Sequence, residues 1–119
     1  MGERTIMPII KIIGGKKPKQ QNVKKRDPFY GSAIWRELRK RLKKERPWCE
    51  YCIDEGVLNP PKMEVADHVR PKNLFPEMAT LYDNLKPSCS KHHNRKRAIE
   101  KQCKTREQFE QRARKEGWI

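Results

Sequence analysis

The spacing of four cysteine and histidine residues constrains this chain more than any other feature. Cys49 and Cys52 are separated by two residues, and so are Cys89 and His92. Two such pairs with a long gap between them are typical of a tetrahedral zinc site, because each short turn can direct two side chains at one ion. Four protein ligands leave no open coordination position. The spacing therefore predicts a structural Zn²⁺ that fastens two distant segments together.

Other interpretations of the cysteines remain open. Cys103 could replace His92 as the fourth ligand, although the repeated spacing favours His92 and makes Cys103 a core residue of the last helices. The cysteines could also be buried, inert thiols. No stretch resembles a signal peptide or a membrane span, so we expect a cytoplasmic protein. In that reducing compartment, closely spaced cysteines are more often metal ligands than disulfides.

The composition indicates a chain with a small core. Only 34% of the 119 residues are hydrophobic, and 37% are charged. The length allows one small domain, and a chain this polar buries little apolar surface against the entropy of ordering. Small domains of this kind usually need a metal, a disulfide or a partner subunit in addition to the core.

The positive charge is concentrated towards the N-terminus. The net charge is +14, of which residues 1–47 contribute +11. Such a segment is suited to binding a polyanion, most often nucleic acid. The alternative is a solvated tail that binds nothing. A membrane surface is less suitable, because no stretch combines a basic face with a clean apolar one.

The two ends of the chain differ in pattern. Residues 1–28 are rich in glycine and lysine without periodicity, and we expect a basic flexible arm there, followed by a folded domain over residues 29–119. In an alternative, the isoleucines of the arm pair with a partner chain or with the domain edge: Ile9, Ile10, Ile12 and Ile13.

Local patterns within residues 29–119 predict helices and short strands. A helix should begin at the N-cap Ser32 and end before Pro47, with a core stripe of apolar residues: Ile34, Trp35, Leu38 and Leu42. We expect strands at 63–69 and 85–88 and a helix at 91–101. A last helix should begin with a capping box at Thr105 and end at Gly117.

Four polar residues lie within the gap between the two ligand pairs or just after the second pair. Asp67 and His68 are adjacent, Asn84 precedes the second predicted strand, and His93 follows at the start of a helix. Together with the paired ligands, this order over residues 48–96 resembles the HNH endonuclease family, particularly its small zinc-stapled phage enzymes. The resemblance implies an α+β fold with a ββα-metal (HNH) core, a structural zinc site and flanking helices.

The resemblance also implies a role for each residue. His68 corresponds to the general base, and Asp67 and His93 to the ligands of a catalytic divalent ion, which is Mg²⁺, Mn²⁺, Ni²⁺ or Zn²⁺. Asn84 corresponds to the residue that ties the loop to the strand and orients the base, although asparagine also fits an ordinary turn. Asn94 is an alternative to His93, as a ligand or a phosphate contact.

One departure from the family pattern bears on these roles. Many relatives carry cysteine where this chain has His92, so the resemblance leaves open which of His92 and His93 faces which ion. His92 remains a residue type that can bind zinc.

Phosphodiester hydrolysis requires residues of these types. A water must be activated in line with the leaving oxygen, and a cation must offset the growing negative charge. A histidine that titrates near neutral pH suits the base. Adjacent residues of a regular strand point to opposite faces, so we expect a local bend that brings Asp67 to the ion and His68 to the water.

The predicted function is a metal-dependent DNA endonuclease that nicks or cuts both strands with low sequence specificity. The resemblance implies that it leaves 5′-phosphate and 3′-hydroxyl ends. Basic side chains near the motif are expected to contact phosphates, although each alone fits ordinary surface charge: Arg39, Lys43, Arg70, Lys91, Arg95, Lys96 and Arg97. The resemblance further implies a phage DNA-packaging role with terminase or portal proteins as partners, in the host cytoplasm. We expect a monomer or weak dimer without membrane contact.

Two other classes of function fit parts of the pattern. A non-catalytic, zinc-stapled nucleic-acid-binding protein would need the staple but not Asp67, His68 and His93. A nuclease or binding protein directed at RNA would need the same residues as the DNA enzyme, and only a comparison of the two substrates separates them.

Overall fold

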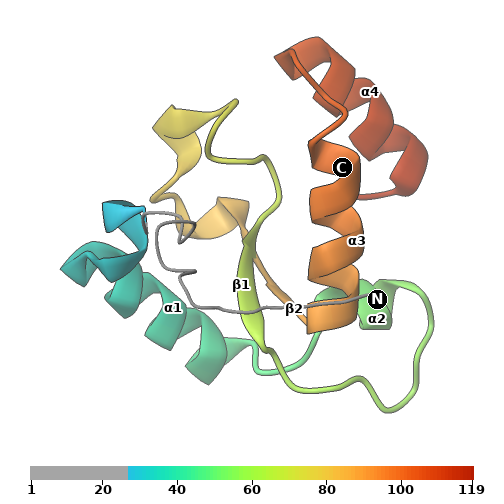
Figure 1. Cartoon of the computed structure of the whole chain (residues 1–119). Coiled ribbons are helices and arrows are strands. Elements are labelled where there is room, and N and C mark those ends of the chain that lie inside the picture. Colours follow the sequence, from blue (N-terminus) through green and yellow to red (C-terminus); the bar gives the residue numbers. More distant parts are fainter. Residues whose placement is uncertain (1–26) are drawn as a thin grey trace, which may run out of the picture.

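The computed structural model describes residues 27–119 and has an α+β fold, as predicted. A two-stranded antiparallel hairpin, β1 (Val65–His68) with β2 (Leu85–Ser88), lies between α1 (Ala33–Glu45) on one side and α3 (Ser90–Glu100) on the other (Figure 1). The remaining elements are α2 (Glu50–Asp54), α4 (Arg106–Glu116) and three 3₁₀ helices: η2 (Pro28–Gly31), η3 (Pro76–Met78) and η4 (Tyr82–Asn84). Within residues 27–119, no helix is long and apolar enough to cross a membrane.

The predicted arm lies almost entirely outside the described residues, and so do its isoleucines. The described chain begins at Asp27, whose carboxylate accepts a hydrogen bond from the Phe29 amide and pairs with Lys72 at 2.5 Å. Pro28 already belongs to η2. The predicted division into an arm over residues 1–28 and a domain over residues 29–119 stays a prediction.

Helix α1 forms where the sequence predicts it. The Ser32 side chain accepts a hydrogen bond from the Trp35 amide, and the helix ends before Pro47. Trp35 and Leu42 are buried, but Ile34 is 54% exposed, so its place in the core stripe was wrong. The buried stripe runs through Trp35 and Leu42, and Ile34 lies about 100° away from Trp35 around the helix axis.

The hairpin positions the central motif. Its register pairs Asp67 with Lys86 and His68 with Leu85. Strand β1 is shorter than the predicted 63–69, because Lys62 and Met63 pair instead with the segment after α1, through a bridge to Trp48 and a hydrogen bond to the Pro47 carbonyl. Strand β2 has the predicted bounds.

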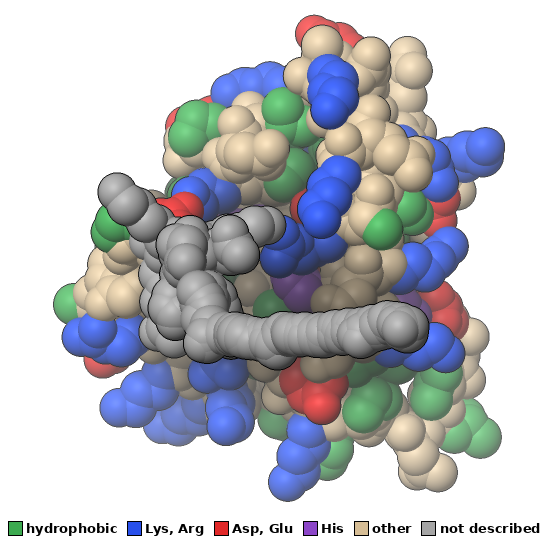
Figure 2. All heavy atoms as spheres, viewed as in Figure 1, with side chains coloured by type: hydrophobic (Ala, Val, Ile, Leu, Met, Phe, Trp, Pro, Cys, Tyr) green, Lys and Arg blue, Asp and Glu red, His purple; other side chains and the backbone are tan. Residues whose placement is uncertain are grey.

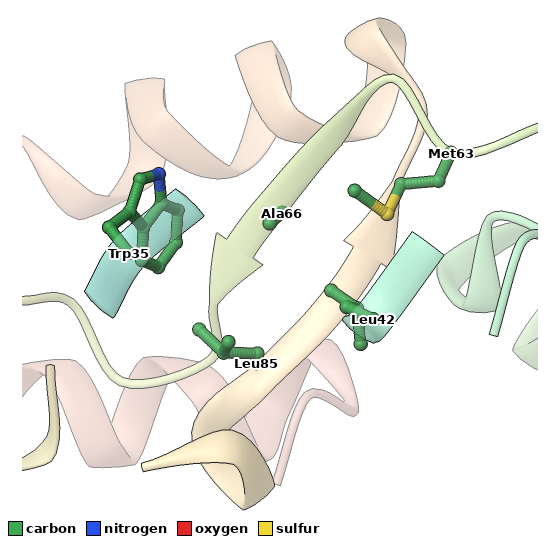
Figure 3. Close-up of a cluster of buried hydrophobic side chains, with 5 residues drawn as sticks. All are labelled: Trp35, Leu42, Met63, Ala66 and Leu85. Atoms are coloured by element: carbon green, nitrogen blue, oxygen red, sulfur yellow. The ribbon is translucent and has the colours of Figure 1, made fainter. Parts of the chain in front are cut away.

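The apolar core consists of three small clusters. One lies between α1 and the hairpin and contains Trp35, Leu42, Met63, Ala66 and Leu85 (Figure 3). A second is made largely of cysteine side chains, and the third joins Phe75 to Phe109 and Ala113 of α4. The small size of each cluster agrees with the low hydrophobic content of the chain.

The C-terminal helices have the predicted limits to within about a residue. The Thr105 hydroxyl accepts a hydrogen bond from the Gln108 amide. Gly117 closes α4 with φ of 84°, a left-handed conformation that glycine adopts without strain. Cys103 is half-buried against the Phe75–Phe109 cluster, which is the core position that the sequence suggested.

Candidate active site and metal centres

Three cysteines and one histidine converge where α2, β2 and α3 meet. The donor atoms of Cys49, Cys52, Cys89 and His92 all lie within 4.8 Å of one another. The His92 Nδ1 atom is 3.2 Å from the Cys89 sulfur and 3.4 Å from the Cys52 sulfur. Tetrahedral zinc with ordinary Zn–S and Zn–N bonds places its ligand atoms about 3.5–3.8 Å apart, so the group fits one such ion.

The surroundings of this group also fit a metal. Glu55 lies 3.0 Å from the Nε2 atom of His92, which directs Nδ1 at the cysteines, as outer carboxylates do for metal-bound histidines. Burial, together with the neighbouring thiols of Cys49 and Cys89, raises the pKa of Cys52 to about 12. Three thiolates this close together need the charge of a cation, so the donor set suits a dication and not free thiols.

A second pair of potential metal ligands lies at the centre of the molecule. The Oδ1 atom of Asp67 on β1 and the Nδ1 atom of His93 on α3 are 3.2 Å apart, a separation suited to two ligands of one ion. Burial alone would raise the pKa of Asp67, but hydrogen bonds from His93 and Tyr51 and the charge of Lys96 hold it below its usual range. The carboxyl group is therefore ionised near neutral pH.

The other oxygen of Asp67 is held by two different groups. The Tyr51 hydroxyl donates to Oδ2 at 2.6 Å, and the Lys96 ammonium lies 3.2 Å from it. Lys96 is only 2% exposed, donates to the His68 carbonyl at 2.9 Å and pairs with Glu100. The expectation that Lys96 contacts phosphate was wrong, because its ammonium is buried among these groups.

His68 lies at the end of β1 with its ring against α1. Its Nε2 atom is 2.9 Å from the Ala79 carbonyl, and its ring stacks on Trp35 with centroids 5.0 Å apart. A carbonyl only accepts, so Nε2 carries the proton and Nδ1 offers a free lone pair. Burial lowers the pKa of His68 below its ordinary value, so the ring is neutral at physiological pH.

Asp67 and His68 leave β1 in different directions. Asp67 contacts Tyr51 of α2 and His93 of α3, whereas His68 faces Trp35 of α1. The chain bends immediately after β1. Both side chains nevertheless line one cleft. A regular strand, whose side chains alternate between its two faces, is therefore enough to place both residues there.

Asn84 fastens the loop that follows β1. Its side-chain oxygen accepts from the Arg70 amide at 2.9 Å, and its amide group donates to the carbonyls of Arg70 and Met78 at 3.0 and 3.3 Å. Met78 precedes Ala79, whose carbonyl holds His68. Asn84 is thus placed where it fixes the segment that orients the histidine ring.

The comparison with known proteins agrees with this geometry. The family model of the HNH endonuclease matches residues 49–98, which include both groups of potential ligands. These residues form an HNH endonuclease domain. The crystal structure of the HNH endonuclease of the deep-sea thermophilic bacteriophage GVE2 with a manganese ion is similar, with 29% sequence identity and a TM-score of 0.55. The match covers 62% of this chain and 79% of that chain, and no curated protein matches.

The candidate active site of the HNH domain opens into a cleft of about 570 Å³. Asp67, His68 and His93 line it, and its wall carries four basic side chains beside four acidic ones: Arg39, Lys72, Arg97 and Lys101 with Asp27, Glu64, Asp67 and Glu100. Figure 2 shows Lys and Arg side chains around a histidine on this face, with more of them over α1. The four basic side chains are of the kind that contacts the phosphates of a nucleic acid.

The other basic residues predicted to bind nucleic acid lie apart from this cleft. Arg70 is half-buried and pairs with Glu110 of α4 at 3.1 Å, and Arg95 pairs with Glu116 at 3.0 Å. Lys43 and Lys91 are exposed outside the cleft. Of the predicted contacts, the structure brings Arg39 and Arg97 beside the metal-ligand pair of the HNH domain.

Sequence reasoning missed four residues around the HNH site. Lys72 and Lys101 line the cleft, and so does Tyr30 of η2, which is 47% exposed. Nothing in the local pattern distinguishes the two lysines from other surface charges. The signal for Tyr51 was its position between Cys49 and Cys52, two of the potential metal ligands.

Proposed function

We propose that this chain is a metal-dependent endonuclease that hydrolyses phosphodiester bonds in DNA with low sequence specificity. One observation carries the proposal: Asp67 and His93 present a metal-ligand pair, and His68 a neutral imidazole, to one cleft that Arg39, Lys72, Arg97 and Lys101 also line. A binding protein has no need of this combination, whereas hydrolysis requires each part.

Each side chain of the site has a separate role in the proposed reaction. Asp67 and His93 would hold the divalent cation, which would supply Lewis-acid stabilisation of the charge that grows on the phosphate and the leaving oxygen. His68 takes a proton from the attacking water at Nδ1, since its Nε2 is committed to Ala79. Asn84 keeps the loop that carries Ala79 in place. The products are 5′-phosphate and 3′-hydroxyl ends.

The cleft suits the backbone of DNA more than its bases. Arg39, Lys72, Arg97 and Lys101 are placed to contact phosphates, and phosphate contacts carry no direct sequence information. Affinity should therefore fall steeply with salt and vary little with sequence. The similar GVE2 enzyme comes from a bacteriophage. On the family resemblance alone, we propose a packaging role beside terminase or portal proteins in the host cytoplasm.

A plasmid assay tests the proposal directly. We expect supercoiled DNA to be converted to the nicked or linear form with Mg²⁺, Mn²⁺ or Ni²⁺, and to stay intact with EDTA, because the catalytic cation is exchangeable while the Cys₃His ion is closed in. Parallel reactions with RNA determine the preferred substrate. Binding of DNA without cutting under any metal would instead indicate the non-catalytic binding protein.

Cleavage should be insensitive to pH until the solution is distinctly acidic. The neutral form of His68 is the active one, and burial lowers its pKa below 6.5, so log(kcat/KM) should fall with unit slope only below that value. The measurement is initial nicking rate between pH 5 and 8 at saturating Mn²⁺. If the midpoint moves when the Mn²⁺ concentration is lowered from saturation, the limb reports metal binding and not His68, which would contradict this prediction.

A further inference from the structure

Tyr51 connects the two potential metal centres of the domain. It lies on α2 between Cys49 and Cys52, two of the Cys₃His ligands, yet its hydroxyl donates to the Asp67 carboxylate at 2.6 Å. The residue is only 5% exposed. One side chain thus spans from the turn that holds one ion to a ligand of the other.

The Cys₃His turn, more than β1, fixes the position of the Tyr51 ring. The ring stacks against His92, with centroids 6.0 Å apart and an angle of 19° between the planes. The Lys86 ammonium lies 4.4 Å from the ring centroid and is anchored by Asp54 at the end of α2. Movement of the Cys₃His turn would therefore move the hydroxyl that Asp67 accepts from.

The hydrogen bond from Tyr51 gives the two oxygens of Asp67 different partners. Oδ1 faces His93 Nδ1 at 3.2 Å, whereas Oδ2 accepts from Tyr51 and lies beside the Lys96 ammonium. With Oδ2 occupied by two donors, only Oδ1 remains for a cation. The carboxylate is held as a one-oxygen ligand in a fixed orientation.

We propose that Tyr51 is a positioning residue that makes cation affinity at Asp67 and His93 depend on an ordered Cys₃His turn. The inference rests on the proposed role of Asp67 and His93 as ligands of the catalytic ion. Outer partners of metal ligands typically contribute 10–100-fold in affinity or activity. Coupling of this kind is reciprocal, so a cation at Asp67 should also order the Cys₃His turn.

The test is Mn²⁺ binding to zinc-loaded Tyr51→Phe, measured from the electron paramagnetic resonance signal of free Mn²⁺. We expect the Kd to rise about 10–100-fold while one zinc per chain is retained, because the phenyl ring keeps the packing and loses only the hydroxyl. The matched control is Tyr82→Phe, which removes a 2.9 Å hydrogen bond to Glu45 on the surface. Its Mn²⁺ affinity should equal that of the wild type.

If Tyr51→Phe fails to fold or to hold zinc, a second measurement on the protein with Tyr51 in place tests the inference. The chain has three tyrosines, so 3-fluorotyrosine labelling gives three ¹⁹F resonances, assigned with Tyr30→Phe and Tyr82→Phe. Mg²⁺ should shift the Tyr51 resonance and leave that of Tyr82 unchanged. An unmoved Tyr51 resonance at saturating Mg²⁺, or a Tyr51→Phe Kd within about twofold of wild type, overturns the inference.

The outcomes separate this inference from the proposed function. A wild-type protein that cuts DNA, together with Tyr51→Phe of unchanged Mn²⁺ affinity, defeats the coupling alone. A wild-type protein that binds Mn²⁺ more tightly than Tyr51→Phe but never cuts DNA defeats the nuclease proposal and leaves the coupling supported.

Discussion

Replacement of His68 by alanine should reduce DNA cleavage by about 10²–10⁴-fold, the usual contribution of a general base. The structural reason is that Nε2 is bonded to the Ala79 carbonyl, which leaves Nδ1 as the basic atom of a residue that lines the cleft. Affinity for DNA should change little, because the basic side chains proposed to contact phosphate lie elsewhere on the wall: Arg39, Lys72, Arg97 and Lys101. Plasmid nicking and gel-shift titration in parallel measure the two effects.

The buried position of His68 requires a control for folding. The ring is 7% exposed and stacks on Trp35, so alanine leaves a cavity that lowers the free energy of unfolding. His68→Gln is the matched variant, because its amide nitrogen can still donate towards Ala79 while it supplies no base. Both variants should be equally inactive, although the glutamine variant should melt closer to the wild type.

Chemical rescue distinguishes a missing base from a damaged site. Added imidazole should restore part of the activity of His68→Ala, which has room for it, and none of that of His68→Gln. Lys91→Ala, on the exposed start of α3 outside the cleft, should cut like the wild type. Nicking by His68→Gln at the wild-type rate would remove His68 from the mechanism.

Much of the fold follows from local rules, which is why it was predictable. Caps such as Ser32 and Thr105 and the stop at Gly117 are satisfied by atoms within a few residues, so the sequence carries the whole signal. The N-terminal limit of β1 was not predictable in this way. It depends on Lys62 and Met63 pairing with a segment about 15 residues away.

Long-range burial explains why the site could be predicted only in part. Lys96 was expected on the surface because it stands in a basic run, yet it lies one helical turn after His93 and therefore on the face of α3 turned to β1. The spacing carried that information, but only the position of β1 shows that the face is buried. The assignment of His92 to the cysteines and His93 to Asp67 likewise depends on how α3 is placed.

Replacement of Cys49 by serine should release the tightly held zinc and unfold the domain. Cys49 is fully buried, and three of the four proposed ligands make up most of the second apolar cluster, so this part of the interior depends on the ion more than on packing. Structural zinc contributes about 10–16 kcal/mol in small zinc-finger peptides, which exceeds the usual stability of a small domain. Elemental analysis after dialysis and circular dichroism measure the two losses.

Cys103→Ser is the matched control, since it makes the same chemical change outside the Cys₃His group. Cys103 is half-buried, and its thiol donates a long hydrogen bond of 3.7 Å to the Ile99 carbonyl. This variant should keep one zinc per chain and lose about 1 kcal/mol in the free energy of unfolding. If Cys49→Ser stays folded with its zinc, the ion is not held by this group. If Cys103→Ser loses the ion, the fourth ligand is Cys103 and not His92. The short distances from His92 Nδ1 to the sulfurs of Cys52 and Cys89 would then not reflect metal binding.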